Sequence, residues 1–419
     1  MTAEILSTGD EVLLGDLVDT NSAFLCGRLR EMGIRVSQIT VKGDDVDGVC
    51  DAVQAISRRA ALCLVTGGLG PTQDDITALA CAKALGESLV LNPSALASMK
   101  TYFDRRGFEL TSDNEKQAWL PVSALVLENT HGTAPGFAFQ LNQCWFFCMP
   151  GVPSEMKQMM EACVVPRIQT IQGTGTRLPI RRFTVFGLHE SKVGGLLASF
   201  NDQYPGIRLG FRASFPIIEV KLVGDAGMDE KDGNALLDRA GVWVAQQLGP
   251  KVVSDTGLSL EAEVGKLLAQ QGRTLAVAES CTGGLISHLI TQVPGSSDYF
   301  LLSAVTYANS AKINVLGVRP DTLETFGAVH ETTALEMAEG ARRVAGSDWA
   351  VSTTGIAGPG GGPTLKPVGT VCIGVAGPGG VAAARKFEFK FDDRDKNKKM
   401  FAAMALELLR RYLTDQISA

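Results

Sequence analysis

The sequence lacks any segment long and apolar enough to cross a membrane. No run reaches the ~20 consecutive apolar residues of a membrane span. The first residues, Met1 to Glu4, show no basic region followed by an apolar run. We therefore expect a soluble, cytoplasmic protein without a membrane partner.

Cysteine pairs and excess positive charge are also missing. The nine cysteines are scattered and form no Cys-x-x-Cys, and Cys144 and Cys148 have no second pair or nearby histidines for a zinc site. We expect reduced thiols. The 39 lysines and arginines face 45 aspartates and glutamates, for a net charge of −6. Because binding nucleic acid takes a clustered basic surface, this balance argues against such a partner.

The 419 residues with 45% hydrophobic content suffice for two or three domains with buried cores. Up to about residue 170, short apolar runs alternate with helical patterns, which predicts an α/β sheet with helices on both faces. The expected strands are Ala3 to Leu6, Val36 to Val41, Leu62 to Val65, Ala124 to Leu127 and Cys144 to Cys148, and the expected helices are Asn21 to Met32, Val46 to Ala60, Ile76 to Leu85 and Pro93 to Arg105.

A glycine-rich turn, Thr66 to Asp75, follows one of these strands and leads into a helix. Its glycines allow backbone amides to approach a phosphate, and Asp74 and Asp75 are suited to holding a divalent cation against a diphosphate. The alternative is a tight turn whose carboxylates only favour the helix dipole.

The character changes after the glycine and threonine stretch 172–176, which we interpret as a linker. A small α+β module follows. It lacks a basic Gly-x-x-Gly loop, so RNA binding is not implied. Its expected strands are Ile180 to Phe186, Ile207 to Phe211 and Ile217 to Val223, and its expected helices are Glu190 to Phe200 and Gly233 to Leu248.

The stretch Thr274 to Gly284 predicts a strand that delivers Ser280 to the start of a helix over Leu285 to Val293. Unpaired N–H groups there would hold a phosphate or the oxyanion of acyl transfer. The alternative is that Ser280 or Thr282 only caps the helix. The rest of this region predicts a second α/β unit, with helices at Leu258 to Gln270, Thr332 to Val344 and Asp395 to Leu413 and strands at Leu301 to Thr306, Trp349 to Thr353, Thr370 to Val375 and Ala382 to Phe389.

Three motifs follow downstream: Tyr307 to Lys312, Thr353 to Pro359 and Lys366 to Thr370. None of them contains a histidine. A serine nucleophile needs a base, so Lys312 is the candidate, and burial or a nearby positive charge must then lower its pKa. The alternative is that Lys312 is an exposed surface lysine.

Together with the stretch around Ser280, these motifs resemble the C-terminal domain of the CinA family (competence/damage-inducible protein A) over residues 255 to 415. Members of this family include nicotinamide mononucleotide deamidases without a cofactor. The resemblance implies that Ser280 is the nucleophile, Lys312 its base and Tyr307 an orienting or proton-shuttling group, while Cys281 packs. It also implies substrate contacts by Ser297, Thr354, Gly355 and Arg394, although Asp392 stands where relatives have glycine.

The glycine-rich turn, with His131 to Gly136 and Met149 to Met156, is similar to the molybdopterin-binding-like domain of CinA proteins. Several members hydrolyse ADP-ribose there with a divalent metal ion. By resemblance, Gly67, Gly68 and Gly70 match the phosphate turn, and Asp44 and Asp75 match the acidic positions that hold the metal. Further candidates are Thr72 for the substrate, and Asp10 and Asp74, which lie on expected strand-end loops, for the metal.

The sequence thus predicts an N-terminal three-layer domain (1–172), a small α+β connecting domain (177–252) and a C-terminal α/β domain (255–415). The middle domain resembles the KH-like connecting domain of the full-length family, and the resemblance implies that the C-terminal domain is an amidohydrolase. The resemblance implies a homodimer that hydrolyses nicotinamide mononucleotide and ADP-ribose. Two alternatives stay open: a molybdopterin-binding or adenylylating N-terminal module, and a non-catalytic partner of the competence machinery.

Overall fold

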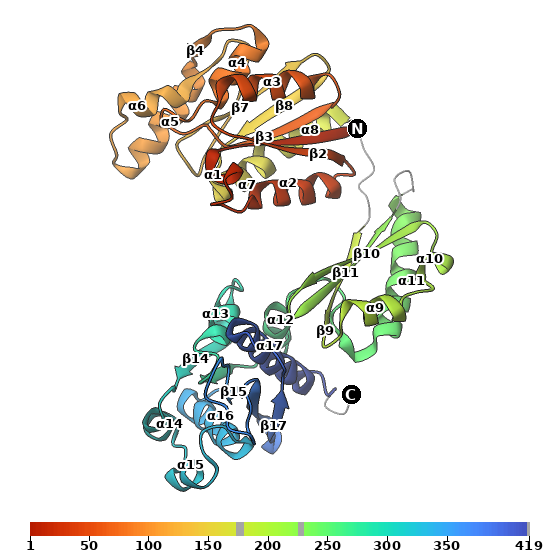
Figure 1. The fold of residues 1–419 in the computed structure, drawn as a ribbon, viewed down its shortest axis with the longest axis vertical. Coiled ribbons are helices and arrows are strands. Elements are labelled where there is room, and N and C mark those ends of the chain that lie inside the picture. The colour runs from red at the N-terminus through yellow and green to blue at the C-terminus, as the bar shows by residue number, and fades with distance from the viewer. Residues whose placement is uncertain (173–179, 225–229, 417–419) are drawn as a thin grey trace. The chain divides into compact units, whose positions relative to one another are not determined.

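The computed structural model describes residues 1–172, 180–224 and 230–416 (Figure 1). The chain divides into two compact units, the first formed by Met1–Pro179 with Asp225–Asp232 and the second by Ile180–Gly224 with Gly233–Ala419. Of the expected linker, residues 173–176 lie outside the described ranges. Within those ranges, every helix is too short or too polar to span a bilayer.

The first unit is built on a six-stranded sheet with the order β2-β1-β3-β8-β7-β6. Four strands, β2, β1, β3 and β8, are parallel, β7 pairs antiparallel with β8, and β6 pairs antiparallel with β7. All residues of β3 are buried, which explains its uninterrupted apolar sequence. The strands are β1 (Thr2–Thr8), β2 (Arg35–Lys42), β3 (Leu62–Thr66), β6 (Leu125–Leu127), β7 (Gly136–Leu141) and β8 (Cys144–Met149).

Helices cover both faces of this sheet, so the expected three-layer architecture is confirmed (Figure 1). One core joins the sheet to α3 (Val46–Ser57), α4 (Thr77–Leu85) and residues of α5 (Pro93–Arg106). The other joins it to α2 (Thr20–Glu31), α7 (Pro153–Met159) and α8 (Val165–Gln172). Phe146 and Phe147 enter opposite cores because successive strand residues point to opposite faces. The remaining elements are α1 (Asp10–Leu13), α6 (Ser112–Glu115) and the strand pair β4 (Leu89–Leu91) and β5 (Trp119–Pro121).

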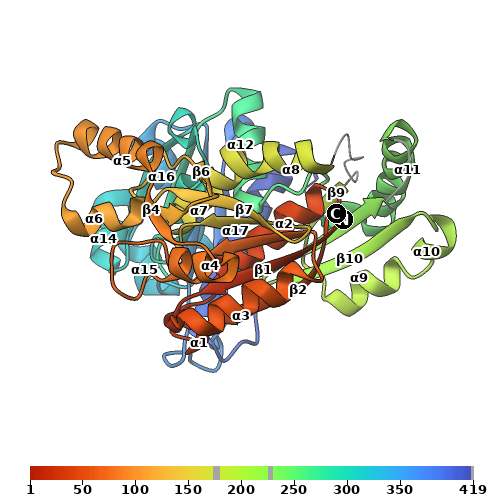
Figure 2. The same ribbon diagram turned by 90° about the horizontal axis from the view of Figure 1, so that it is seen from above.

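The second unit begins with an antiparallel sheet of order β10-β11-β9-β12. Its core also contains residues of the helices α9 and α11, which lie beside it (Figure 1 and Figure 2). The helix expected over Glu190 to Phe200 is interrupted after Leu196. The elements are β9 (Ile180–Phe186), α9 (Glu190–Leu196), α10 (Phe200–Gln203), β10 (Ile207–Ser214), β11 (Ile217–Gly224), α11 (Glu230–Leu248) and β12 (Val252–Ser254).

A five-stranded sheet of order β14-β13-β15-β16-β17 completes this unit. The first three strands are parallel, β16 pairs antiparallel with β15, and β17 pairs antiparallel with β16. One face packs against α12 (Leu260–Gln271), α13 (Leu285–Thr291) and α17 (Arg394–Leu413), and the other against α14 (Asn309–Leu316), α15 (Pro320–Phe326) and α16 (Glu331–Ala345). The strands are β13 (Leu275–Glu279), β14 (Phe300–Val305), β15 (Trp349–Gly355), β16 (Thr370–Ala376) and β17 (Ala382–Glu388).

The small sheet and the five-stranded sheet belong to the same compact unit. A domain boundary between residues 252 and 255 therefore stays a prediction.

Candidate active sites

Ser280 lies directly after the buried strand β13, in the turn that leads to α13. Its N–H donates to the Thr353 carbonyl (3.0 Å), which continues the pairing of β13 with β15 by one residue. Gly283 and Gly284 adopt φ values of 62° and 93°, which residues with a Cβ rarely reach. These two glycines allow the chain to reverse within a few residues of Ser280.

The Glu279 carboxylate occupies the start of α13. This side chain is fully buried and accepts the N–H groups of Gly284 (2.9 Å), Ile286 (3.2 Å) and Ser287 (3.0 Å). Those three N–H groups are therefore already paired. The expectation that they stand open for a phosphate or an oxyanion was wrong, because the residue before Ser280 supplies the anion itself.

Lys312 reaches Ser280 from α14. Its side chain is 1% exposed, and its Nζ lies 3.1 Å from Ser280 Oγ, 2.8 Å from the Thr306 carbonyl oxygen and 3.2 Å from the Tyr307 carbonyl oxygen. Burial lowers the pKa of Lys312 below its ordinary value of 10.5, because desolvation penalises the charged ammonium. Lys312 is therefore not the exposed lysine of the alternative interpretation.

The neighbouring thiol is unsuited to nucleophilic attack. Cys281 is 5% exposed and belongs to the hydrophobic core. Burial raises the pKa of Cys281 to about 12, so the thiol stays protonated near neutral pH.

Two cations of α17 lie beside this turn. Arg394 donates from Nη1 to the Gly358 carbonyl (2.6 Å) and from Nη2 to the Tyr307 hydroxyl (3.3 Å). Lys398 follows one helical turn later, and its Nζ is 3.8 Å from the position that a Cβ on Gly283 would take. Lys398 stands where relatives commonly have a second arginine, but the sequence assigned it no site role, although its i, i+4 spacing from Arg394 was a usable signal.

Two other expected substrate contacts, Thr354 and Gly355, have structural roles in this arrangement. Thr354 is fully buried and donates its hydroxyl to the Ala328 carbonyl (2.7 Å), so it has no proton left to donate to a substrate. A Cβ on Gly355 would lie 2.5 Å from the Thr370 carbonyl oxygen and 3.2 Å from Cys281 Sγ. The absence of a side chain at Gly355 therefore allows β15 to pack closely against Thr370 and Cys281.

Ser297 is not brought to Ser280. It precedes β14, whose first residue, Phe300, pairs with Leu275 at the start of β13, whereas Ser280 follows the far end of β13. The length of a strand thus separates the two serines, and the expected substrate contact by Ser297 is not part of this arrangement.

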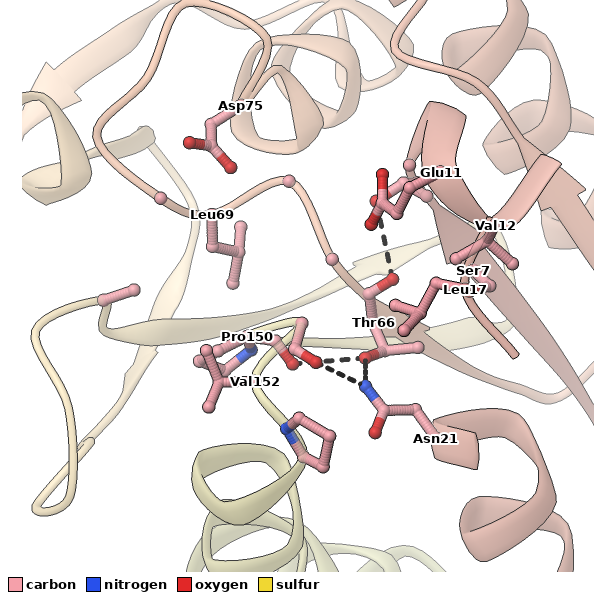
Figure 3. A pocket seen from close by; sticks show the side chains of 18 of the residues that line it. Ser7, Glu11, Val12, Leu17, Asn21, Thr66, Leu69, Asp75, Pro150 and Val152 are labelled. Carbon is pink, nitrogen blue, oxygen red and sulfur yellow. Dashed lines mark hydrogen bonds between the residues drawn. The ribbon is translucent and has the colours of Figure 1, made fainter. Parts of the chain in front are cut away.

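The first unit has a cavity of about 460 Å³ at the carboxyl ends of its parallel strands, with Thr66, Glu11 and Asp75 on its walls (Figure 3). Gly67, Gly68 and Gly70 line it, as expected for the phosphate turn. Gly67 has a φ of 108°, and a Cβ there would collide with the Thr8 carbonyl oxygen. Only glycine fits at this position.

Six acidic residues line this cavity: Glu11, Asp19, Asp44, Asp74, Asp75 and Glu155. Burial, followed by the nearby charges of Asp10, Glu11 and Asp74, raises the pKa of Asp44 despite a hydrogen bond from the Asp10 N–H. The cavity is therefore short of compensating positive charge.

Two expected ligands point elsewhere. The Asp10 carboxylate accepts the Asp44 N–H (3.2 Å) and does not line the cavity, and Thr72 donates its hydroxyl to Asp75 (2.6 Å) instead of facing the cavity. Both side chains form hydrogen bonds that stabilise the loops around them.

Among the described residues, no three His, Cys, Asp or Glu side chains are close enough to hold a metal ion by themselves. Mg²⁺ is commonly held by one or two carboxylates together with substrate phosphates. The acidic residues present here fit such an ion only in company with a phosphate-bearing ligand.

Asn21 belongs to the stretch Asp19-Thr20-Asn21, which contributes to the family resemblance, but no role was assigned to it from the sequence. Its Nδ2 donates to Thr66 Oγ1 (3.0 Å) and to the Gly151 carbonyl (2.7 Å), as Figure 3 shows. Its Oδ1 is buried and has no partner among the described residues. Asn21 thus ties β3 to the loop before α7 and keeps one acceptor unused at the cavity.

Two family models match the chain, the CinA C-terminal domain over residues 258–413 and the probable molybdopterin binding domain over residues 4–170. A CinA-like protein of Desulfosudis oleivorans is 53% identical over 99% of this chain and 100% of its own length. Another from Desulforapulum autotrophicum is 48% identical over 99% of each chain. The solved structure of a competence/damage inducible protein from Agrobacterium tumefaciens is 38% identical, covers 38% of this chain and 97% of its own, and has a TM-score of 0.36.

Proposed function

The chain belongs to the CinA family, and on that premise we propose that its C-terminal domain hydrolyses nicotinamide mononucleotide to nicotinate mononucleotide and ammonia. The observation that carries this proposal is the 3.1 Å contact between Lys312 Nζ and Ser280 Oγ inside a buried environment.

The surroundings of Lys312 suit a general base. A neutral amine has two N–H groups and one lone pair. The Thr306 and Tyr307 carbonyls accept two N–H groups, which directs the lone pair at the Ser280 hydroxyl. Lys312 would take that proton as Oγ attacks the carboxamide carbon, and would return it to the departing ammonia. Water would then hydrolyse the acyl-enzyme to nicotinate mononucleotide.

The two cations of α17, Arg394 and Lys398, are suited to binding the phosphate of the substrate. Arg394 donates to the hydroxyl of Tyr307, which follows Thr306, and Lys398 lies near Gly283, three residues after Ser280. A guanidinium binds phosphate in a bidentate manner and an ammonium adds a point charge. Tyr307, held by Arg394, would orient the substrate between them.

For the N-terminal domain we propose hydrolysis of the diphosphate of ADP-ribose with a divalent metal ion. The supporting observation is a cavity that combines the Gly67–Gly68 turn with the carboxylates of Glu11, Asp44 and Asp74. Glycine amides suit the phosphates, and one or two of the carboxylates suit the metal. The match to a probable molybdopterin binding domain supports a second candidate, in which the same cavity binds a pterin phosphate without hydrolysing it.

A single preparation of the full chain tests both halves. Ammonia release from nicotinamide mononucleotide and AMP release from ADP-ribose are measured with Mg²⁺ present. We expect both activities, and Ser280→Ala should remove only the first. If neither substrate is hydrolysed, the chain is a binding protein and the catalytic proposal fails.

A further inference from the structure

A second large cavity lies in the second unit, between the small antiparallel sheet and α17. Its volume is about 580 Å³, within the range of small-molecule sites, which favour junctions between packed substructures. We propose that this cavity binds a planar aromatic anion, a ligand with a flat ring and a phosphate or carboxylate group.

One wall of the cavity is a row of flat aromatic rings. Phe387, Phe389 and Phe391 occupy alternate positions at the end of β17 and just after it. Successive rings lie 6.3 and 6.4 Å apart with interplanar angles of 15° and 13°. Phe215, from the β10–β11 turn, stands edge-on to Phe391 at 5.2 Å and 88°. Such a wall offers a planar ring both stacked and edge-to-face contacts.

The chain leaves this apolar wall partly open. The Phe215 side chain is 43% exposed, and the three rings of the row are half-buried. Methionines 400 and 404 complete the lining from α17, and their flexible thioethers adapt to ligands of different outline. Covering this surface with a flat apolar ligand would add hydrophobic stabilisation.

The charged residues of the lining favour an anion. The lining includes three cationic side chains, Lys251, Arg385 and Arg411, and one carboxylate, Glu407. That carboxylate already accepts hydrogen bonds from Arg410 (2.7 Å) and Arg411 (2.8 Å). The lining therefore carries a positive excess beside its aromatic wall, which matches an aromatic ring joined to a negative group.

The aromatic wall is linked to the Ser280 neighbourhood. Asn397 Nδ2 donates both to the Phe391 carbonyl (2.8 Å) and to the Ala357 carbonyl (3.0 Å), and Arg394 lies three residues after Phe391. A ligand that shifts Phe391 shifts the segment that positions Arg394. On the proposed deamidase function, occupancy of the cavity therefore changes KM for nicotinamide mononucleotide.

The test is a calorimetric titration of the full chain with 1-naphthyl phosphate. We expect saturable binding that is weakened by at least about tenfold in Phe215→Ala and in Arg385→Ala. The matched control is Lys386→Ala, which removes a neighbouring exposed cation that pairs with Glu388 outside the cavity lining. Phe215 and Arg385 are exposed, so both variants should keep the wild-type circular dichroism spectrum.

Comparison probes decide the ligand class. Binding that is unchanged in Phe215→Ala and Arg385→Ala, or weakened equally in Lys386→Ala, overturns the site. Equally tight binding of decyl phosphate overturns the preference for a ring, and equally tight binding of inorganic phosphate overturns the need for an apolar group. A wild-type KM that does not respond to 1-naphthyl phosphate overturns the coupling to Arg394. The titration itself does not depend on deamidase activity.

Discussion

At Ser280 the proposed chemistry depends on one contact, the 3.1 Å between Lys312 Nζ and Ser280 Oγ, across which the hydroxyl donates to the neutral amine. We predict that Ser280→Ala and Lys312→Ala each reduce ammonia release by at least about 10²-fold, since general-base catalysis contributes that much or more. The double variant should be little worse than either single one, because the serine is inert without its base. Steady-state kinetics of the three variants measures this.

Cys281 provides the matched control for that series. Its thiol is buried and protonated, so Cys281→Ala should keep most of the deamidase activity. An inactive Cys281→Ala beside an active Ser280→Ala would mean that the enzyme is a cysteine amidase.

Lys312 also gives the activity a defined pH dependence. Burial lowers the pKa of Lys312, and only the neutral amine is a base. We predict that kcat/KM rises with pH and levels off with a midpoint below 10.5. A rate that shows no rise at any pH below 10.5 would contradict a lysine base.

The same shift affects stability. Between the folded-state pKa and 10.5 the unfolded chain binds more protons than the folded chain, so the contribution of Lys312 to stability rises with pH. Urea unfolding should show wild type gaining stability relative to Lys312→Met as pH rises through that interval. Parallel curves would mean that the pKa is unshifted.

Among the elements, α17 contributes both Arg394 and Lys398. We predict that Arg394→Ala and Lys398→Ala each lower kcat/KM for nicotinamide mononucleotide by about 10- to 100-fold, as expected for loss of a charge-assisted hydrogen bond. Neither should affect nicotinamide riboside, which has no phosphate. Lys399→Ala is the control, because Lys399 pairs with Asp395 on the exposed surface. Equal losses on both substrates would assign the two cations a structural role.

The elements that could be predicted from the sequence are those with strong periodicity and clear limits. The strand into Ser280 and the helix after it are such a case, and β1, β3 and α17 are others. The helix α14 could not be predicted in this way, because only Lys312 and Leu316 of it are buried and a lysine does not count as a core residue. Its buried lysine is functional, which is where local sequence rules are expected to fail.

Other features of the site depend on packing across the sheet. The Glu279 carboxylate accepts N–H groups at the start of α13. Because β13 and β14 are parallel, Ser297 lies beside the start of β13, whereas Ser280 follows its end. Asp10 turns its carboxylate into its own loop. Spacing along the chain specifies none of these, since each depends on which segment lies opposite.

For the whole molecule, the length of the chain predicted two or three domains. It could not predict that the small sheet and the C-terminal sheet form one compact unit, which the structure shows. Assembly remains a prediction that follows from the family resemblance. Light scattering should give twice 44.4 kDa, and a species of 44.4 kDa alone would contradict a homodimer.

The two units also predict two independent chemical requirements. Carboxylates line the cavity of the first unit, whereas hydroxyl and amine groups surround Ser280. We predict that a chelator abolishes ADP-ribose hydrolysis and leaves deamidation intact, with Mg²⁺ restoring the lost activity. Asp44→Asn should impair only ADP-ribose hydrolysis, whereas Asp51→Asn, on the exposed surface of α3, should impair neither. The carboxylates of the first unit would hold the metal ion, which would supply charge stabilisation to a diphosphate substrate only. Loss of both activities on chelation would contradict this division of chemistry between the units.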